Sequence, residues 1–174
     1  MSVDKVYVMV DIETLDVVPS AVILSIGACV IQDIVDTTFY VELHTDTQYE
    51  RTRSESTIDW WAKQKEGLMP QGTTPIVDAL QSFSRWLSAL RAEPIIWCKG
   101  TDFDTAILSH AYLQYHIPLP WKYNSIRDFR TVKKLFPHYQ FPANPNAHNA
   151  LADAKHQAEE LRAILKANPN LTLA

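Results

Sequence analysis

The sequence predicts an α/β protein with a five-stranded mixed sheet that is flanked by helices. Near the start of the chain, three apolar, strand-like runs follow one another with short links, which is typical of an antiparallel meander. Farther on, a short apolar run leads through a glycine turn into a helical pattern. This order predicts a crossover unit, and therefore a parallel strand that joins the meander.

Three strands are expected in the first quarter of the chain. Residues 6–10 are apolar or β-branched almost without interruption, which is typical of a strand covered on both faces. After a turn at 16–20, residues 21–31 form a second apolar run, and residues 37–43 alternate in the way of a third strand. The polar residues 33–36 then connect the last two strands as a hairpin.

The next part of the chain is expected to be a loop followed by two helices. Residues 44–57 are polar and aperiodic, and loops of this length are often functional. Ser56 or Thr57 is suited to cap a short helix over 58–65. From 75 to about 92, apolar side chains at spacings of three and four predict a longer helix that starts with proline.

The crossover unit occupies the middle of the chain. Residues 95–98 form a short buried strand, Gly100 lies in the turn, and the following helix continues to about residue 115. A short strand over 122–126 and a helix over 128–135 come next.

The chain closes with an irregular segment and a helix. Residues 137–145 contain three prolines, which excludes regular structure, and make a candidate lid over a site. A helix is expected over 149–167, with a core-facing stripe that consists of Leu151, Ala154, Ala158, Leu161 and Leu165.

Length and composition indicate one globular domain over residues 1–174. Apolar residues make up 47% of the 174 residues and charged residues 21%, which is enough to bury a sizeable core. No run approaches the roughly 18 apolar residues of a membrane helix, and the first residues lack a signal-peptide pattern, so a cytoplasmic location is expected. Cys29 and Cys98 lie in apolar runs and are interpreted as reduced core residues. The net charge of −4 neither indicates nor excludes a nucleic-acid substrate.

Two carboxylates follow the first strand. Asp11 and Glu13 are two residues apart, so in a strand their side chains leave the backbone on the same face. Two neighbouring carboxylates repel each other, and a hard divalent cation with oxygen ligands is the simplest reason to place them together. The alternative is that both are ordinary loop residues where a strand ends in solvent.

Acidic residues recur at two later points. The sequence is Gly-Thr-Asp-Phe-Asp at 100–104 and His-Asn-Ala-Leu-Ala-Asp at 148–153. In order, D-x-E, F-D and H-x4-D resemble the three motifs of the DEDDh family of 3′–5′ exonucleases, which have a ribonuclease H-like fold. The resemblance extends over 6–165 and is strongest to the subgroup of the small phage exonuclease A, exonuclease VIII-like enzymes and ribonuclease AS.

The resemblance implies a metal-dependent active site. Asp11, Glu13, Asp104 and Asp153 would hold two divalent ions, Mg²⁺ or Mn²⁺, with Asp11 bridging them. His148 would accept the proton of the attacking water, a role suited to imidazole. Five residues on one helix are separated by roughly 140°. His148 is therefore expected at or before the start of the helix that carries Asp153.

The middle motif contains two aspartates. The family pattern ends in Phe-Asp, so Phe103 and Asp104 match it and Asp102 takes the variable position before them. The asparagine usual in this motif is absent. Lys99 lies in its neighbourhood, where it would either contact a substrate phosphate or be a solvated strand end.

Residues beside the motifs are candidates for substrate binding. In the family, the positions of Thr14 and Leu15 offer backbone groups and an apolar wedge to the terminal nucleotide. Phe103, in the middle motif, is a further candidate for substrate binding. Trp60 and Trp61 are neighbours on a helix and point about 100° apart. One of them, taken here as Trp61, would stack on a base, unless both pack in the core.

A basic face is also expected. Arg127, Arg130 and Lys134 are spaced three and four residues apart, with Lys133 beside them, and this face would guide phosphates, meet a partner subunit or be merely solvated. The remaining histidines show no ligand spacing and are given no role. They are His44, His110, His116, His138 and His156.

The predicted function is 3′–5′ exonucleolytic release of nucleoside 5′-monophosphates from single-stranded nucleic acid. DNA is favoured as substrate over RNA, the substrate of ribonuclease AS, because most of the similar enzymes act on DNA. The alternatives are a non-catalytic module that binds nucleic acid and an endonuclease of the ribonuclease H kind. A homodimer is plausible, as in related enzymes.

Overall fold

The computed structural model describes residues 4–32, 37–171 and 173, and its centre is a five-stranded sheet. The strands are β1 (Lys5–Thr14), β2 (Ile23–Val30), β3 (Thr38–Glu42), β4 (Glu93–Cys98) and β5 (Ile126–Asp128). Their order is β3-β2-β1-β4-β5, with β1–β2 and β2–β3 antiparallel and β1–β4 and β4–β5 parallel. The predicted mixed sheet, in which a meander is joined by parallel strands, is confirmed.

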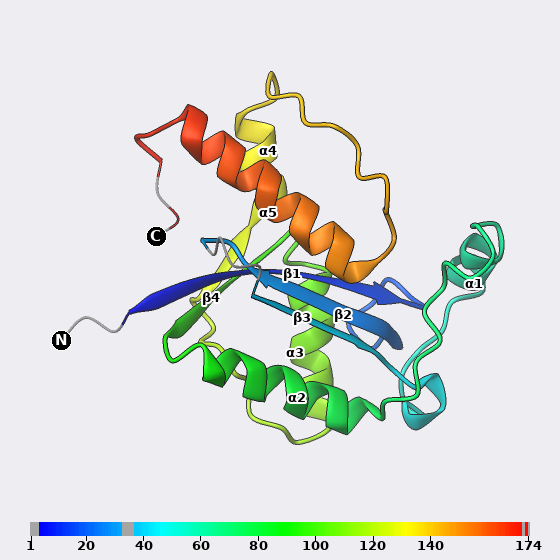
Figure 1. Ribbon diagram of the computed structural model, residues 1–174. Helices are drawn as coiled ribbons and strands as arrows, with labels where there is room; N and C mark the ends of the chain where they lie inside the picture. The colour runs from blue at the N-terminus through cyan, green and yellow to red at the C-terminus, as the bar shows by residue number, and fades with distance from the viewer. Residues whose placement is uncertain (1–3, 33–36, 172, 174) are drawn as a thin grey trace.

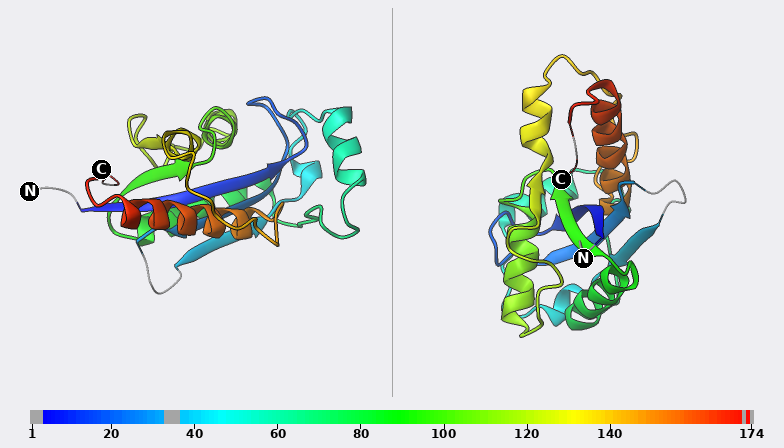
Figure 2. Two further views of the ribbon diagram at one scale, coloured as in Figure 1. Left: turned by 90° about the horizontal axis from the view of Figure 1, so that it is seen from above. Right: turned by 90° about the vertical axis from the view of Figure 1, so that its left-hand side faces the viewer.

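Helices cover both faces of this sheet. They are α1 (Glu55–Ala62), α2 (Ile76–Ala89), α3 (Asp104–Gln114), α4 (Phe129–Leu135) and α5 (Ala150–Ala167), with a 3-10 turn η1 (Thr45–Thr47). The helices α2 and α3 lie on one face and α4 and α5 on the other, and α1 lies beside the end of β1 (Figures 1 and 2). Among the described residues, no helix is long and apolar enough to cross a membrane.

The two faces of β1 contribute to different cores. Val8, Val10 and Ile12 belong to the apolar cluster under α2 and α3. Met9 belongs to the cluster under α4 and α5. Because side chains alternate along a strand, Asp11 shares the face of Met9, and the D-x-E motif of β1 is directed toward α5.

Several boundaries differ from the expected ones. Ser54 caps α1, rather than Ser56 or Thr57, because its side-chain oxygen accepts a hydrogen bond from the amide of Thr57. The last strand begins at Ile126, where the predicted strand ends, because its pairing with β4 starts at Ile96. The predicted hairpin connection at 33–36 lies outside the described residues.

The predicted loop at 44–57 contains η1 and two buried polar side chains. Gln48 is fully buried because it donates to the carbonyl of Ile23 and accepts from its amide. Arg51 is also buried, and it donates to backbone carbonyls that include that of Ala21. This segment is therefore fixed to the start of β2 by hydrogen bonds rather than by apolar packing.

Candidate active site

Asp11 and Glu13 lie at the end of β1, opposite two small residues of β2. In the antiparallel register, Asp11 pairs with Gly27 and Glu13 with Ser25. A Cβ atom at Gly27 would lie 2.2 Å from the amide nitrogen of Leu151 in α5. The absence of a side chain at Gly27 thus lets the first turn of α5 lie directly on the sheet, next to the carboxylate of Asp11.

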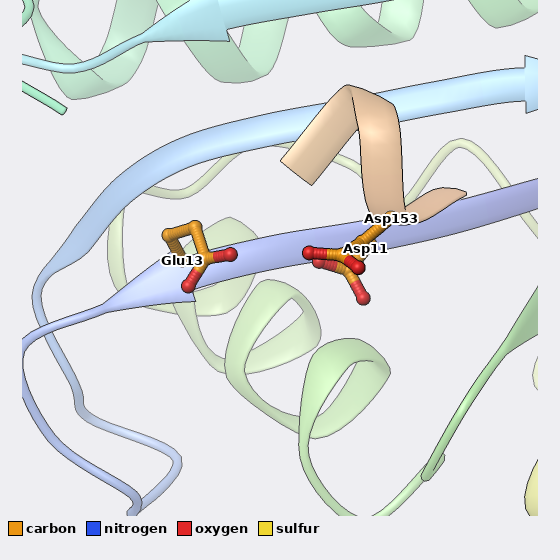
Figure 3. A group of neighbouring side chains, drawn as sticks. All are labelled: Asp11, Glu13 and Asp153. Atoms are coloured by element: carbon orange, nitrogen blue, oxygen red, sulfur yellow. The ribbon is translucent and has the colours of Figure 1, made fainter. Parts of the chain in front are cut away.

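The first turn of α5 brings Asp153 to this point. Asn149 caps the helix, since its side chain accepts from the amide of Ala152. Ligand atoms of Asp11, Glu13 and Asp153 all lie within 4.8 Å of one another. Figure 3 shows Asp153 reaching from α5 toward Asp11, with Glu13 farther along the same strand.

Asp104 comes from the start of α3 and is 3% exposed. The parallel pairing of β1 with β4 ends at Met9 and Trp97, so the strands have no ladder bond beyond this point. Asp104 Oδ1 instead accepts the amide of Ile12, at 3.2 Å. The carboxylate therefore lies beside Asp11 and occupies the gap where the two strands separate. Asp102, by contrast, has a side chain that is 82% exposed.

His148 lies just before α5, as the spacing argument predicted. Its backbone is left-handed (φ 68°), and its amide donates to Asp153 Oδ2 at 2.7 Å. The other oxygen of Asp153 accepts from Asn144 in the proline-containing segment. The imidazole packs edge-on against Trp60, with ring centroids 4.7 Å apart. These contacts hold the ring at the rim of the acidic group.

Burial is the main reason why the pKa values of three motif carboxylates are raised, and neighbouring carboxylates add to the effect at Asp11 and Glu13. Burial, and then the charges of Asp104, Glu13 and Asp153, hold the pKa of Asp11 well above its usual range, while the hydrogen bond from Gln157 lowers it. Burial, followed by Asp153 and Asp104, raises the pKa of Glu13 to about 8. Burial raises the pKa of Asp104 to about 7, although the hydrogen bond from the amide of Ile12 lowers it. Negative charges held this close without cations are unfavourable.

This donor set fits divalent metal ions. The grouped ligand atoms are carboxylate oxygens from two segments of the chain, β1 and α5, and Asp104 from α3 lines the same cavity. Hard cations such as Mg²⁺ and Mn²⁺ prefer such ligands. A bound cation would also remove the repulsion that raises the pKa values of Asp11 and Glu13.

Two cavities flank the carboxylates and share Ile12, Glu13 and Phe103. The larger, which we call the acidic cavity, has a volume of about 530 Å³ and is lined by all four motif carboxylates and His148. The smaller, which we call the aromatic cavity, has about 350 Å³ and is lined by both tryptophans and Thr14. Both volumes are in the range of small-molecule sites.

Four of the five predicted substrate-binding residues line at least one of these two cavities, and Leu15 does not. Thr14 and Phe103 line the aromatic cavity, and Lys99 lines the acidic cavity. Trp61 also lines the aromatic cavity, but it is 5% exposed and its indole N–H donates to the carbonyl of Thr14. Leu15 lies outside both cavities and packs in a small core with Trp61.

Trp60 is the more exposed tryptophan. Its side chain is 39% exposed, and its ring contacts both Trp61 and His148. Both rings line the aromatic cavity, but Trp61 is buried in the core and Trp60 is partly exposed to solvent.

The expected basic face is divided in the structure. Arg127 lies in β5 rather than on α4, because the helix begins only at Phe129, and its guanidinium donates to backbone carbonyls. Arg130 and Lys133 line the acidic cavity. The four residues thus do not share one helical face, since the predicted spacing assumed a helix that includes Arg127.

Sequence reasoning missed a polar wall on α5. Gln157 and Glu160 are 5% and 3% exposed and line the acidic cavity. Gln157 Nε2 donates to Asp11 Oδ1 at 2.8 Å, and Glu160 forms an ion pair with Lys133. The signal was available, because both follow Asp153 at i+4 and i+7 and so lie on its helical face. His156, which was given no role, also lines this cavity.

Gln157→Leu is expected to weaken metal binding about 10–100-fold, the usual effect of losing a group that orients a ligand. The reason is that Asp11 loses the hydrogen bond that fixes its carboxylate. Titration with Mn²⁺, followed by calorimetry, measures the affinity. Gln81→Leu makes the same change on the exposed surface of α2 and serves as control. Equal affinities in the two variants would contradict the role of Gln157.

Solved structures share this fold. The E. coli ExoI complex with single-stranded DNA, in a zinc-bound form, matches with a TM-score of 0.68 and 12% identity over 96% of this chain and 42% of that chain. The nuclease domain of 3′hExo, a DEDDh family member bound to rAMP, matches with a TM-score of 0.64 and 12% identity over 96% of this chain and 94% of that domain. The cell-death related nuclease CRN-4 matches with a TM-score of 0.63 and 14% identity over 95% and 65%. The chain thus spans less than half of ExoI.

These solved structures are nucleases, and on the fold that they share with this chain the gathered carboxylates form a candidate active site. A comparison with curated protein sequences gives no match. A family model does match, over residues 6–165. The chain belongs to the family of the Rv2179c-like 3′–5′ exoribonuclease domain.

Proposed function

We propose that this chain removes nucleoside 5′-monophosphates one at a time from the 3′ end of single-stranded nucleic acid in a metal-dependent reaction. The observation that carries the proposal is the gathering of Asp11, Glu13 and Asp153 within 4.8 Å, with Asp104 beside them. His148 lines the same cavity and is the candidate general base.

The four carboxylates and the histidine have different roles in this proposal. Asp11, Glu13, Asp104 and Asp153 would hold two divalent ions, which would supply an activated water and neutralise charge on the phosphate. His148 takes the proton of the attacking water, and its ring is kept in place by Trp60 and by the amide contact with Asp153. The proposed proton acceptor and the carboxylates thus line the same cavity.

The aromatic cavity is the proposed place of the 3′-terminal nucleoside. It adjoins Glu13, and its lining combines the hydroxyl-bearing Thr14 with the rings of Phe103 and Trp60. Base faces stack well on aromatic rings irrespective of sequence. This arrangement supports a strand that ends at the site, as an exonuclease requires.

The sugar of the substrate is the open part of the proposal. The family description names exoribonucleases, which favours RNA, whereas the sequence resemblance favoured DNA and ExoI is solved with single-stranded DNA. We take RNA as the first substrate to test. Recognition of the 2′-hydroxyl needs only one or two hydrogen bonds, so the two sugars must be compared directly.

The test uses RNA and DNA strands of equal sequence, each with a 5′ label, in the presence of Mg²⁺ or Mn²⁺. We expect a ladder that shortens one nucleotide at a time from the 3′ end, with faster shortening of RNA. Asp11→Asn, which keeps the size of the side chain but removes its charge, should show no shortening. A closed circular strand separates the endonuclease alternative, because only an endonuclease would cut it. Binding without cleavage would favour the non-catalytic module.

A further inference from the structure

The acidic cavity has a basic side formed by Lys99 and two residues of α4. Lys99, Arg130 and Lys133 line the same cavity as the motif carboxylates. Their charges are not equivalent. Lys133 forms an ion pair of 2.6 Å with Glu160, whose side chain is 4% exposed, so this lysine is engaged in neutralising a buried acid.

Arg130 is held against the cavity wall by the turn before α3. Its Nη2 donates to the carbonyl of Lys99 at 3.0 Å. A Cβ atom at Gly100 would lie 2.6 Å from the same nitrogen, so the missing side chain makes room for the guanidinium. Gly100 also has a φ of 122°, which side chains rarely adopt. The turn thus forms a slot for this arginine.

The acids near Arg130 leave its charge available. In the described part of the chain, its one ion pair is with Asp102 at 3.9 Å, and both side chains are largely exposed. Asp128 lies near enough to feel its charge, but the oxygens of that carboxylate accept from the backbone amides of Thr101 and Thr131. Asp104 feels its charge as well. Two divalent ions would balance the four motif carboxylates, and the exposed Asp102, at 3.9 Å, would then remain the ion-pair partner of Arg130.

The two cavities match the two sides of the scissile phosphate, which is the phosphate between the last two nucleosides of the strand. On its 3′ side lies one nucleoside with apolar base faces, which suits the aromatic cavity. On its 5′ side the strand continues with another phosphate, which suits a cation. Arginine binds phosphate through a planar fork of N–H groups and is hard to replace in that role.

We propose that Arg130 binds the phosphate immediately 5′ of the penultimate nucleoside, the next one upstream of the scissile phosphate. The inference rests on the proposed function, and it makes the site recognise a strand of at least two nucleotides with an internal or 5′ phosphate. Arg130 is accordingly a substrate-binding residue, and Gly100 is the residue that gives it room.

The test combines a neutral phosphate with a neutral residue. The substrates are oligonucleotides with one uncharged methylphosphonate linkage, placed either at the proposed position or three linkages farther upstream. Single-turnover release of the first nucleotide is measured for the wild-type chain and for Arg130→Gln. Arg127→Gln makes the same change three residues away, outside both cavities, and is the matched control.

For wild type, neutralising the proposed phosphate should lower kcat/KM by about 10–100-fold, the range for a charge-assisted hydrogen bond. Arg130→Gln should lose a similar factor on the normal strand and nothing further on the neutral one. Arg127→Gln should respond to the neutral linkage as wild type does. The distant linkage should have little effect on any of the three proteins.

The outcomes separate this inference from the proposed function. The inference is wrong if the neutral linkage lowers the kcat/KM of Arg130→Gln by the same factor as that of wild type. It is also wrong if the distant neutral linkage lowers kcat/KM as much as the one at the proposed position. In both cases the enzyme still cleaves the normal strand. If wild type releases nothing from the normal strand, the proposed function is overturned, and the inference with it. Should Arg130→Gln not fold, Arg130→Lys keeps the charge without the fork, and it should show a partial loss that shrinks on the neutral strand.

Discussion

Gly27→Ala is expected to lower exonuclease activity by roughly 100-fold or more, although Gly27 lines neither the acidic nor the aromatic cavity. The added methyl group would lie 2.2 Å from Leu151 N and 2.3 Å from the carbonyl carbon of Ala150. These are backbone atoms of a helix, so α5 as a whole must move away from the sheet. The movement would carry Asp153 away from Asp11, which pairs with Gly27.

The activity of Gly27→Ala should be measured together with its Mn²⁺ affinity and its thermal stability. Overpacking of this kind costs about 1–3 kcal/mol, so the variant should still fold. Gly67→Ala is the control, because it adds the same methyl group where nothing lies within 4 Å, at the expense of local backbone strain. A folded Gly27→Ala with wild-type activity would show that α5 does not need this close approach.

Without divalent ions, the protein is expected to lose stability as pH rises from about 4.5 to 8. In the folded state, burial and neighbouring acids raise the pKa of Glu13 from 4.5 to about 8. The folded protein therefore binds more protons than the unfolded chain in this window, and its stability falls as pH increases. At 1.36 kcal/mol per pKa unit, and allowing for partial exposure of Glu13, the loss is roughly 2–4 kcal/mol. It corresponds to about 5–15 °C in Tm.

Thermal melts in a chelator at pH 5 and pH 8 measure this loss. Glu13→Gln should be more stable than wild type at pH 8 and should depend less on pH, while Glu159→Gln, an exposed change on α5, should follow wild type. Adding Mn²⁺ at pH 8 should raise the Tm of wild type, because an ion that binds only the folded state stabilises it. A chelated wild type that melts no lower at pH 8 than at pH 5 would contradict the prediction.

Much of the fold and the acidic centre could be predicted because each depends on a local pattern. Residues 6–10 are covered on both faces and read as an uninterrupted apolar strand. The two-residue period then places Asp11 and Glu13 on one side. Two residues that are five apart on one helix point in different directions, so His148 was expected to precede the helix that carries Asp153. The structure places it before α5.

The parts that could not be predicted depend on contacts between distant segments. The prediction of a single basic face was wrong, because no local sequence pattern shows that Arg127 belongs to a strand that pairs with β4. Gln48 and Arg51 read as solvated loop residues, and they are buried because backbone groups near the start of β2 satisfy them. Which tryptophan faces solvent likewise depends on the bond from Trp61 to Thr14.

The contribution of α5 also affects when the enzyme can act during its own synthesis. A nascent chain that has emerged only as far as α4 already holds Asp11, Glu13 and Asp104, and it can form β1, β2 and β4. It has no Asp153 and no His148, and the surface at Gly27 is bare. The helix that completes the acidic site therefore emerges after the segments that carry the other three carboxylates.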